Sequence, residues 1–306
     1  MRVRHTLMTT PTLPIDWHSQ PPAAAPALCQ PGSAAEALSA SRQLGPRAAF
    51  IAGGTALPLT WGVAEEARPE VSHLIDLLAG VLSADINVDV LPDGTPVLRL
   101  GAGVTLETLR RDARVRSVAP RLAEAIEAIA APGVRHLATL GGNIGWRWGD
   151  ALPALLAAGA WVRTADGTQA PLERVLDEAR AAGCDVPLVI DVAWPLRNAP
   201  RTGWSIAEKL GWRAAFSPSR LTLALEVGWD AGVFSAPRVA ATAAGWPARR
   251  LAHVERWLDG RSPAALADRG SELRQACLAD GADASRARLL ARLLVGHLSR
   301  EARVHG

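Results

Sequence analysis

Two glycine pairs, each beside small polar residues, are the features of this sequence best suited to binding chemistry. The first is Gly53-Gly54 followed by Thr55, and the second lies within Thr139-Leu-Gly-Gly-Asn143. Consecutive glycines leave backbone N–H groups unobstructed, so that a turn can point several donors at one anion such as a phosphate. A helix that begins at such a turn adds its positive end. The ordinary alternative for each pair is a tight turn between a strand and a helix that needs a positive φ.

Polar side chains next to these glycines extend the same chemistry. Thr55 offers a hydroxyl donor, Asn143 an amide that can bind a phosphate or a ring edge, and Asp150 a carboxylate for a ribose hydroxyl. The first loop has neither the GxGxxG pattern of a Rossmann site nor the GK[ST] end of a P-loop. Two such loops in one chain suit a ligand with two phosphates and a sugar at each end.

Cysteine and histidine spacing predicts no metal site. Cys29, Cys184 and Cys277 lie far apart without a CxxC, and the seven histidines form no pair at metal-ligand spacing. We interpret the cysteines as reduced thiols of a cytoplasmic protein. The sequence also shows no nucleophile–base triad and no pair of carboxylates, so we predict no catalytic residue in this chain.

Composition indicates an ordinary globular protein. The chain has 306 residues, 49% of them hydrophobic and 21% charged, and a net charge of +3. The densest basic stretch, at 110–116, includes Asp112 and follows Glu107, so we interpret it as a solvated helix face and predict no nucleic-acid binding. We find neither the ~20 continuous apolar residues of a membrane helix nor the apolar core of a secretory signal.

Lysine is almost absent from this chain. Lys209 is the only lysine among 33 Lys and Arg residues, and there is no tyrosine. A single lysine in such a composition is a candidate functional residue, for which a solvated surface position is the ordinary alternative.

The elements that must position these residues follow from hydrophobic periodicity and from turn residues. A strand at 47–52 leads into the first glycine pair, and a helix follows at 56–62 with Pro58 in its first turn. Ser33 opens an earlier helix and Thr105 a later one. The other expected elements before residue 198 are strands at 73–77, 96–102, 161–164 and 186–191 and helices at 120–130 and 152–158.

Three regions divide the chain. Residues 1–26, rich in Pro, Ala and Thr, are expected to form a flexible tail, and a polar stretch near 196–203 predicts a domain boundary. We therefore predict one domain at 27–198 and a second at 203–306. The second is an α+β unit with its strands before its helices. We expect strands at 220–229 and 233–242 and helices at 249–258, 263–279 and 284–300.

The sequence resembles the FAD-binding (medium) subunit of the xanthine dehydrogenase and carbon monoxide dehydrogenase family of molybdenum hydroxylases. Four segments carry the resemblance, in the same order over nearly the whole chain after the tail. They are QPGSAAEAL leading to AGGTALPL, LRLGAGVTLETL, APGVRHLATLGGNIG with DALPALLAAGAWV, and EKLGWRAAFSPSRLTLALEV with ARRLAHVERWLDGRSP.

The resemblance implies a fold and a set of cofactor contacts. The fold is α+β, with an FAD-binding domain of the vanillyl-alcohol oxidase and p-cresol methylhydroxylase type, made of two α/β subdomains. A C-terminal domain of antiparallel strands and helices follows it. FAD lies extended between the subdomains, with Asp150 at its adenosine end and Lys209 near the flavin. The remaining implied contacts are Ala52, Gly53, Gly54, Thr55, Ala56 and Leu57 at the pyrophosphate, Thr105, and the second cradle of Thr139, Gly142, Asn143 and Ile144.

The function implied by the resemblance is electron relay within a complex like the xanthine, aldehyde and carbon monoxide dehydrogenases. One partner subunit carries the molybdenum cofactor and another the [2Fe-2S] clusters, in a heterotrimer, and electrons pass through FAD to a terminal acceptor. Some relatives hold an iron–sulfur cluster in this subunit, and the isolated cysteines here argue against one. Two alternatives stay open, a flavin-free scaffold subunit and a stand-alone flavin oxidase or dehydrogenase of the same fold.

The loop Asn143–Asp150 departs from the family pattern, because it is short and contains Trp146, Arg147 and Trp148. We hypothesise that one of these tryptophans shields the isoalloxazine, in place of an aromatic residue missing near Lys209. Simple packing is the alternative.

Overall fold

The structure, a computed structural model, describes residues 26–57, 71–196, 203–212, 219–263, 266 and 269–305. The predicted tail, apart from Pro26, lies outside the described residues. So do most of the helix expected at 56–62 and residues 197–202 of the boundary predicted near 196–203.

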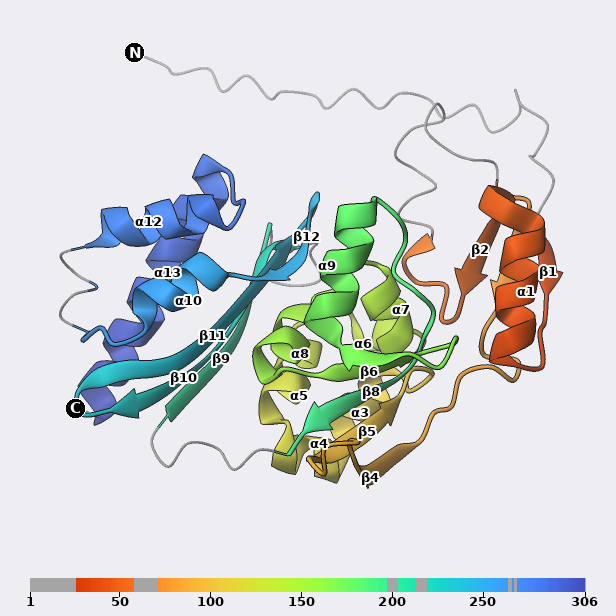
Figure 1. Ribbon diagram of the computed structural model, residues 1–306, viewed down its shortest axis with the longest axis horizontal. Coiled ribbons are helices and arrows are strands. Elements are labelled where there is room, and N and C mark those ends of the chain that lie inside the picture. The colour runs from red at the N-terminus through yellow and green to blue at the C-terminus, as the bar shows by residue number, and fades with distance from the viewer. Residues whose placement is uncertain are drawn as a thin grey trace, which may run out of the picture.

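The N-terminal unit, as far as the structure describes it, is a small parallel sheet with the helix α1 beside it. Its strand order is β1-β3-β2, and the helix α1 begins after the N-cap Ser33, whose hydroxyl accepts from the backbone N–H of Glu36, as predicted. Figure 1 shows this unit at one end of the molecule. Its elements are β1 (Ala27–Cys29), α1 (Ala34–Leu44), β2 (Ala48–Ile51) and β3 (His73–Asp76).

The central unit is a five-stranded antiparallel sheet of order β4-β5-β8-β6-β7 with helices packed on it. Its strands are β4 (Ile86–Val90), β5 (Pro96–Gly101), β6 (Trp161–Thr164), β7 (Gln169–Pro171) and β8 (Val189–Pro195). Its helices are α3 (Leu106–Arg111), α4 (Ala113–Val118), α5 (Pro120–Glu127), α6 (Pro132–Arg135), α7 (Leu140–Gly145), α8 (Leu152–Ala158) and α9 (Leu172–Ala182). The sequence did not predict β4, and β8 begins later than the strand expected at 186–191.

The C-terminal unit is a four-stranded antiparallel sheet of order β12-β11-β10-β9, with helices on its outer face (Figure 1). Its elements are β9 (Gly203–Gly211), β10 (Ser219–Asp230), β11 (Val233–Ala243), β12 (Trp246–Arg250), α10 (Ala252–Leu258), α12 (Gly270–Ala279) and α13 (Ala284–His305). The expected order of strands before helices is confirmed. The helix expected at 249–258 begins only at Ala252, because the residues before it pair with β11 as β12.

Strand β10 is buried on both faces, and its sequence shows how. Leu221, Leu223 and Leu225 point into the core formed with the C-terminal helices, whereas Thr222 and Ala224 alternate toward the central unit. Large side chains therefore fill the core of the C-terminal unit, and small ones allow a close approach to the central unit.

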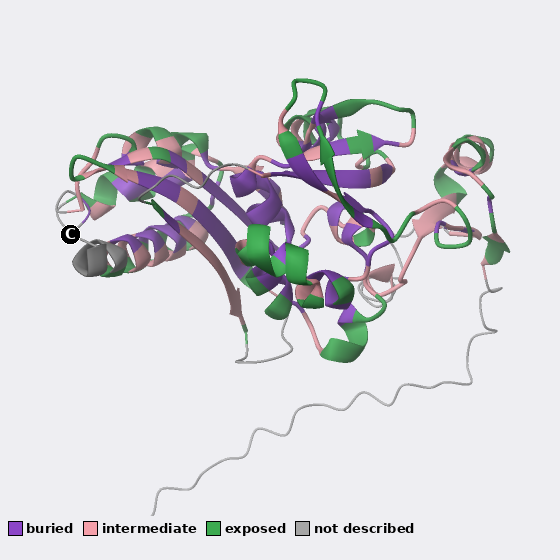
Figure 2. Ribbon diagram, turned by 90° about the horizontal axis from the view of Figure 1, so that it is seen from below, coloured by how far each residue is buried: buried purple, intermediate pink, exposed green. Residues whose placement is uncertain are grey.

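Helix α8 occupies the space between the two larger sheets. All seven of its residues are buried, as expected of a helix that is apolar on every side. Ala154 and Ala157 pack with Ala224 and Ala207 of the C-terminal sheet, while its leucines enter the central core. Figure 2 shows buried residues concentrated in the larger sheets and in the region between them. The two units therefore share one interior.

We predict that Ala154→Leu destabilises the protein by about 1–3 kcal/mol, because a larger side chain does not fit between α8 and β10. Ala154 is 2% exposed. Thermal unfolding measures the effect. Ala182→Leu, at an exposed position of α9, is the matched control and should leave the melting temperature unchanged. Equal melting temperatures for the two variants would contradict the packing described here.

Candidate functional site

The first glycine loop lies against the segment that leads into the second glycine pair. Gly54 has φ +66°, a conformation that favours glycine. A Cβ atom built on Gly53 would overlap the backbone carbonyl of Leu137. Gly53 is thus required by a close approach of two backbones, and this approach brings the two predicted loops together.

The first loop presents open backbone donors. Among the described residues, the N–H groups of Gly53, Gly54, Thr55 and Ala56 have no hydrogen-bond partner. All four residues are partly exposed. A short run of unpaired N–H groups after a strand can bind an anion such as a phosphate.

The second glycine pair is not an open loop, and that prediction was wrong. It forms the first turn of α7, with Thr139 as N-cap. The first backbone N–H groups of α7 donate within the chain, Leu140 to Val104 O (3.0 Å) and Gly141 to Ala102 O (2.8 Å). Those of Gly142 and Asn143 donate to Thr139, at Oγ1 (3.1 Å) and at the carbonyl oxygen (3.0 Å).

The reason is close packing between α7 and the turn after β5. A Cβ atom on Gly141 would lie 2.8 Å from that of Ala102, so Gly141 permits the contact. Backbone donors of this segment are therefore used internally. A cofactor contact here must come from side chains, such as the Asn143 amide, whose oxygen accepts from Ala151 N (3.1 Å) and whose NH₂ remains a donor. Ile144 is fully buried and has only its backbone to offer.

Two predicted site threonines lie side by side. Thr105 and Thr139 pair as an isolated antiparallel bridge, and the N–H of Leu106 donates to Ala138 O at 2.8 Å. Thr105 caps α3, as predicted, by accepting from the backbone N–H of Thr108. The structure thus joins the N-termini of α3 and α7, which are far apart in sequence.

A buried ion cluster supports this junction. The side chain of Glu107, 1% exposed, accepts from Arg135 (2.8 Å), Arg110 (2.7 Å) and Arg111 (2.7 Å). Arg135 also donates to the carbonyl oxygens of Ile129 and Ala130, each at 2.9 Å. Hydrogen bonds from Arg110 and Arg135 hold the pKa of Glu107 well below its ordinary range. Our interpretation of Glu107 as part of a solvated helix face was therefore wrong.

Asp150 and Lys209 are in direct contact. The Lys209 Nζ lies 3.0 Å from Asp150 Oδ2, and both side chains are largely buried. Asp150 Oδ1 also accepts from the hydroxyls of Ser219 and Thr222, the second at 2.6 Å. Nothing in the spacing of residue types had indicated Ser219 or Thr222 as site residues. Because the ion pair joins them directly, Asp150 and Lys209 cannot lie at opposite ends of an extended FAD.

The tryptophan loop is anchored to its surroundings. Trp146 and Trp148 pack edge to face with ring centroids 5.3 Å apart, and Arg147 has φ +58°. The Arg147 guanidinium donates to Cys184 O (2.7 Å) and to Asp185 Oδ1 (2.6 Å). The buried Trp148 Nε1 has no hydrogen-bond partner among the described residues. That one tryptophan shields the isoalloxazine stays a hypothesis.

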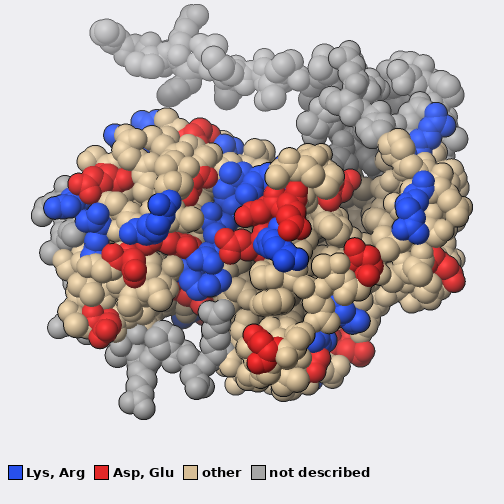
Figure 3. Space-filling model, in the orientation of Figure 1, with Lys and Arg blue, Asp and Glu red and all other residues tan. Residues whose placement is uncertain are grey.

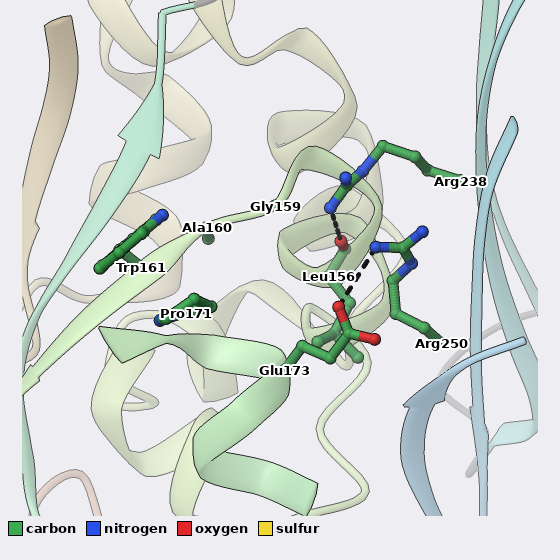
Figure 4. A pocket seen from close by; sticks show the side chains of 8 residues that line it. All are labelled: Leu156, Gly159, Ala160, Trp161, Pro171, Glu173, Arg238 and Arg250. Atoms are coloured by element: carbon green, nitrogen blue, oxygen red, sulfur yellow. Dashed lines mark hydrogen bonds and ion pairs between the residues drawn. The ribbon is translucent and has the colours of Figure 1, made fainter. Parts of the chain in front are cut away.

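A cavity of about 230 Å³ lies elsewhere, between the central and C-terminal units (Figure 4). Arg238 donates to Leu156 O (3.2 Å) at the end of α8, and Arg250 pairs with Glu173 (3.2 Å). The cavity contains none of the predicted site residues. Its lining is Leu156, Gly159, Ala160, Trp161, Pro171, Glu173, Arg238 and Arg250.

Charges of both signs gather where α9 meets β12 (Figure 3), the place of the Arg250–Glu173 pair. Within the described ranges, no helix has the length and apolar character to cross a membrane. We also find no metal site in the described part of the chain, where no group of three or more His, Cys, Asp or Glu residues could hold a metal ion.

The parallel βαβ unit and the five-stranded unit meet at the open N–H donors of the first loop. Such an arrangement is typical of a protein that binds an anionic cofactor. The chain belongs to the family of the FAD-binding domain in molybdopterin dehydrogenases, whose model matches residues 23–186. FAD is the cofactor of this family, and the predicted resemblance and the predicted cofactor are confirmed.

Solved structures share the fold. Carbon monoxide dehydrogenase from Hydrogenophaga pseudoflava, in a form lacking the Mo-pyranopterin moiety, matches with TM-score 0.69 and 24% identity over 91% of this chain and 97% of that one. Reconstituted CO dehydrogenase from Oligotropha carboxidovorans matches with TM-score 0.69 and 19% identity, over 92% of this chain and 99% of that one. Quinoline 2-oxidoreductase from Pseudomonas putida 86 matches with TM-score 0.63 and 18% identity, over 91% of this chain and 98% of that one. At these identities the matches establish the predicted α+β fold.

The described residues fit FAD in part. The open donors of the first loop, together with the close approach of Gly53 to Leu137, suit a pyrophosphate. The first turn of α7 contributes no open N–H group, so its predicted role depends on side chains.

We predict that Gly53→Ala weakens FAD binding at least about ten-fold, equivalent to ~1.4 kcal/mol, because its Cβ separates the loop from Leu137. Titration of the flavin-free protein with FAD, followed by flavin fluorescence, measures the affinity. Gly133→Ala is the matched control, since nothing lies within 4 Å of its Cβ. Equal affinities for the two variants would show that the close approach is unimportant for binding.

We predict a pH-dependent destabilisation by Glu107→Gln. The pKa of Glu107 is lowered by folding, so its contribution to stability is present above the ordinary carboxyl pKa and is lost as pH falls toward the folded value. The wild type should melt above the variant at neutral pH, and the difference should narrow below about pH 4. Glu124→Gln, at an exposed carboxyl paired with Arg121, should change little at any pH. A constant difference between wild type and Glu107→Gln would refute this.

Proposed function

We propose that this chain is the FAD-binding, electron-transferring subunit of a molybdenum hydroxylase complex. Its partners would be a subunit with the molybdenum cofactor and a subunit with [2Fe-2S] clusters, which deliver electrons that leave this chain to a terminal acceptor. FAD, when bound, supplies the exchange between one-electron and two-electron transfer. The chain's own task is then to bind, orient and electrostatically tune that cofactor.

The observation that carries the proposal is the open first loop placed beside the second glycine segment. The N–H groups of Gly53–Ala56 have no partner in the described part of the chain and can bind phosphate oxygens, and the contact with Leu137 fixes the loop. Thr105 and Thr139 lie together nearby through their bridge. Side chains of Asn143 and Lys209 would add polar contacts. The proposed polar contacts are therefore Ala52–Leu57, Thr105, Thr139, Asn143, Asp150 and Lys209.

The extent of the structural matches supports a subunit rather than a complete enzyme. This chain covers 97–99% of the matched chains, two of which belong to structures of CO dehydrogenase and one to quinoline 2-oxidoreductase. The C-terminal unit is included in that match, so the correspondence extends well beyond the FAD-binding domain.

An absorption spectrum of the purified full chain tests the proposal first, with the cofactor released and identified. We expect about one FAD per chain, because the open donors described here form one loop that can hold one pyrophosphate. A folded protein that stays flavin-free after incubation with FAD would overturn the proposal in favour of a scaffold. Turnover of a substrate by the chain alone would instead indicate a stand-alone flavin enzyme.

A further inference from the structure

We propose that Asp150, Ser219 and Thr222 form a positioning group that fixes the Lys209 ammonium at the flavin end of the cofactor site. The C-terminal unit thereby helps to set the reduction potential of the bound FAD. This inference rests on the proposed function, because it concerns the cofactor that the chain is proposed to bind.

The contacts define an ordered cluster. Thr222 Oγ1 donates to Asp150 Oδ1 at 2.6 Å, and Ser219 donates to the same oxygen. The other carboxylate oxygen, Oδ2, faces Lys209 Nζ at 3.0 Å. With one oxygen held by two hydroxyls, the carboxylate cannot rotate freely, and the lysine has a fixed partner.

Burial makes this geometry consequential. The side chains of Lys209 and Asp150 are 10% and 14% exposed, and Thr222 is 3% exposed. A buried ion pair is retained at low cost only when further hydrogen bonds satisfy its charges. The two hydroxyls provide those bonds, and weak solvent screening lets the position of the ammonium matter.

The register of the C-terminal sheet explains why these residues meet. Lys209 of β9 lies directly opposite Thr222 of β10, so both side chains leave the same face of the sheet. Glu208, the preceding residue, points to the other face, where it contacts His297 of α13. Lys209 is thus directed at the central unit, toward Asp150, which precedes α8.

The ammonium keeps donors for a ligand. Lysine has three N–H donors, and Asp150 accepts one of them. Among the described residues no other partner of Lys209 Nζ is present. The free donors can face the cofactor, where a fixed cation favours the negative charge that arrives with electrons. Direct contact also places Asp150 at the same end as Lys209.

The test measures the reduction potential of the full chain loaded with FAD. The variants are Lys209→Met, the pair Ser219→Ala with Thr222→Val, and the combination of all three. Thr222→Ser keeps the hydroxyl and serves as the conservative variant. Ser205→Ala is the matched control, because the Ser205 hydroxyl also joins the two units, accepting from Arg121 Nε at 2.8 Å, but does not touch Asp150.

We expect Lys209→Met to lower the preference for reduced over oxidised flavin about ten-fold, a fall of about 30 mV for a two-electron couple. The double variant Ser219→Ala with Thr222→Val should also lower the potential. Combined with Lys209→Met, it should cause no further fall in the potential, because the hydroxyls act through the lysine. Thr222→Ser and Ser205→Ala should keep the wild-type potential, and FAD is supplied in excess so that the potential of each variant is measured with cofactor bound.

Three outcomes would overturn the inference. If the reduction potential fell in Lys209→Met but stayed unchanged in the double variant Ser219→Ala with Thr222→Val, the two hydroxyls would have no positioning role. If every variant bound FAD with an unchanged reduction potential, Lys209 would not lie at the flavin end, and the proposed function would still stand. A wild-type chain that binds no FAD would overturn the proposed function as well.

Discussion

Helix α8 has no exposed side, and the arrangement of both larger units depends on that. Its leucines complete the central core, and its alanines meet alanines of β9 and β10. Small side chains on both sides let backbones approach closely, so that this helix is buried by two sheets at once. Neither unit can move far without exposing this apolar surface. Asp150, just before α8, is thereby held at the boundary, where the C-terminal sheet presents Lys209 and Thr222.

The candidate cofactor site is assembled in a similar way from segments distant in sequence. Gly53 admits the carbonyl of Leu137, and the bridge between Thr105 and Thr139 joins two helix N-termini. Beneath them, Glu107 and Arg135 form a buried pair whose desolvation is offset by several further hydrogen bonds. Of these described segments, the first loop retains open N–H donors and the first turn of α7 does not, which concentrates their capacity for anion binding in the first loop.

Elements with strong local signals could be predicted from the sequence. Ser33 and Thr105 cap helices as expected, and the buried strand β10 follows its run of alternating Leu and small residues. The second glycine pair could not be distinguished in this way, because a threonine before two glycines suits an anion loop and a capped helix equally. Strands β4, β9 and β12 were missed, since each is specified mainly by its partner strand rather than by its own residues.

The sequence by itself carried the family resemblance, and the resemblance in turn implied the fold class and the cofactor. The motifs that carry the resemblance can be recognised in the sequence because they are local and occur in a fixed order. Only the tertiary structure decided which N–H groups remain open, that Glu107 is buried, and that Asp150 lies against Lys209. Each of these depends on contacts between residues far apart in the chain. Burial and hydrogen-bond satisfaction are set by such contacts and not by the spacing of residue types.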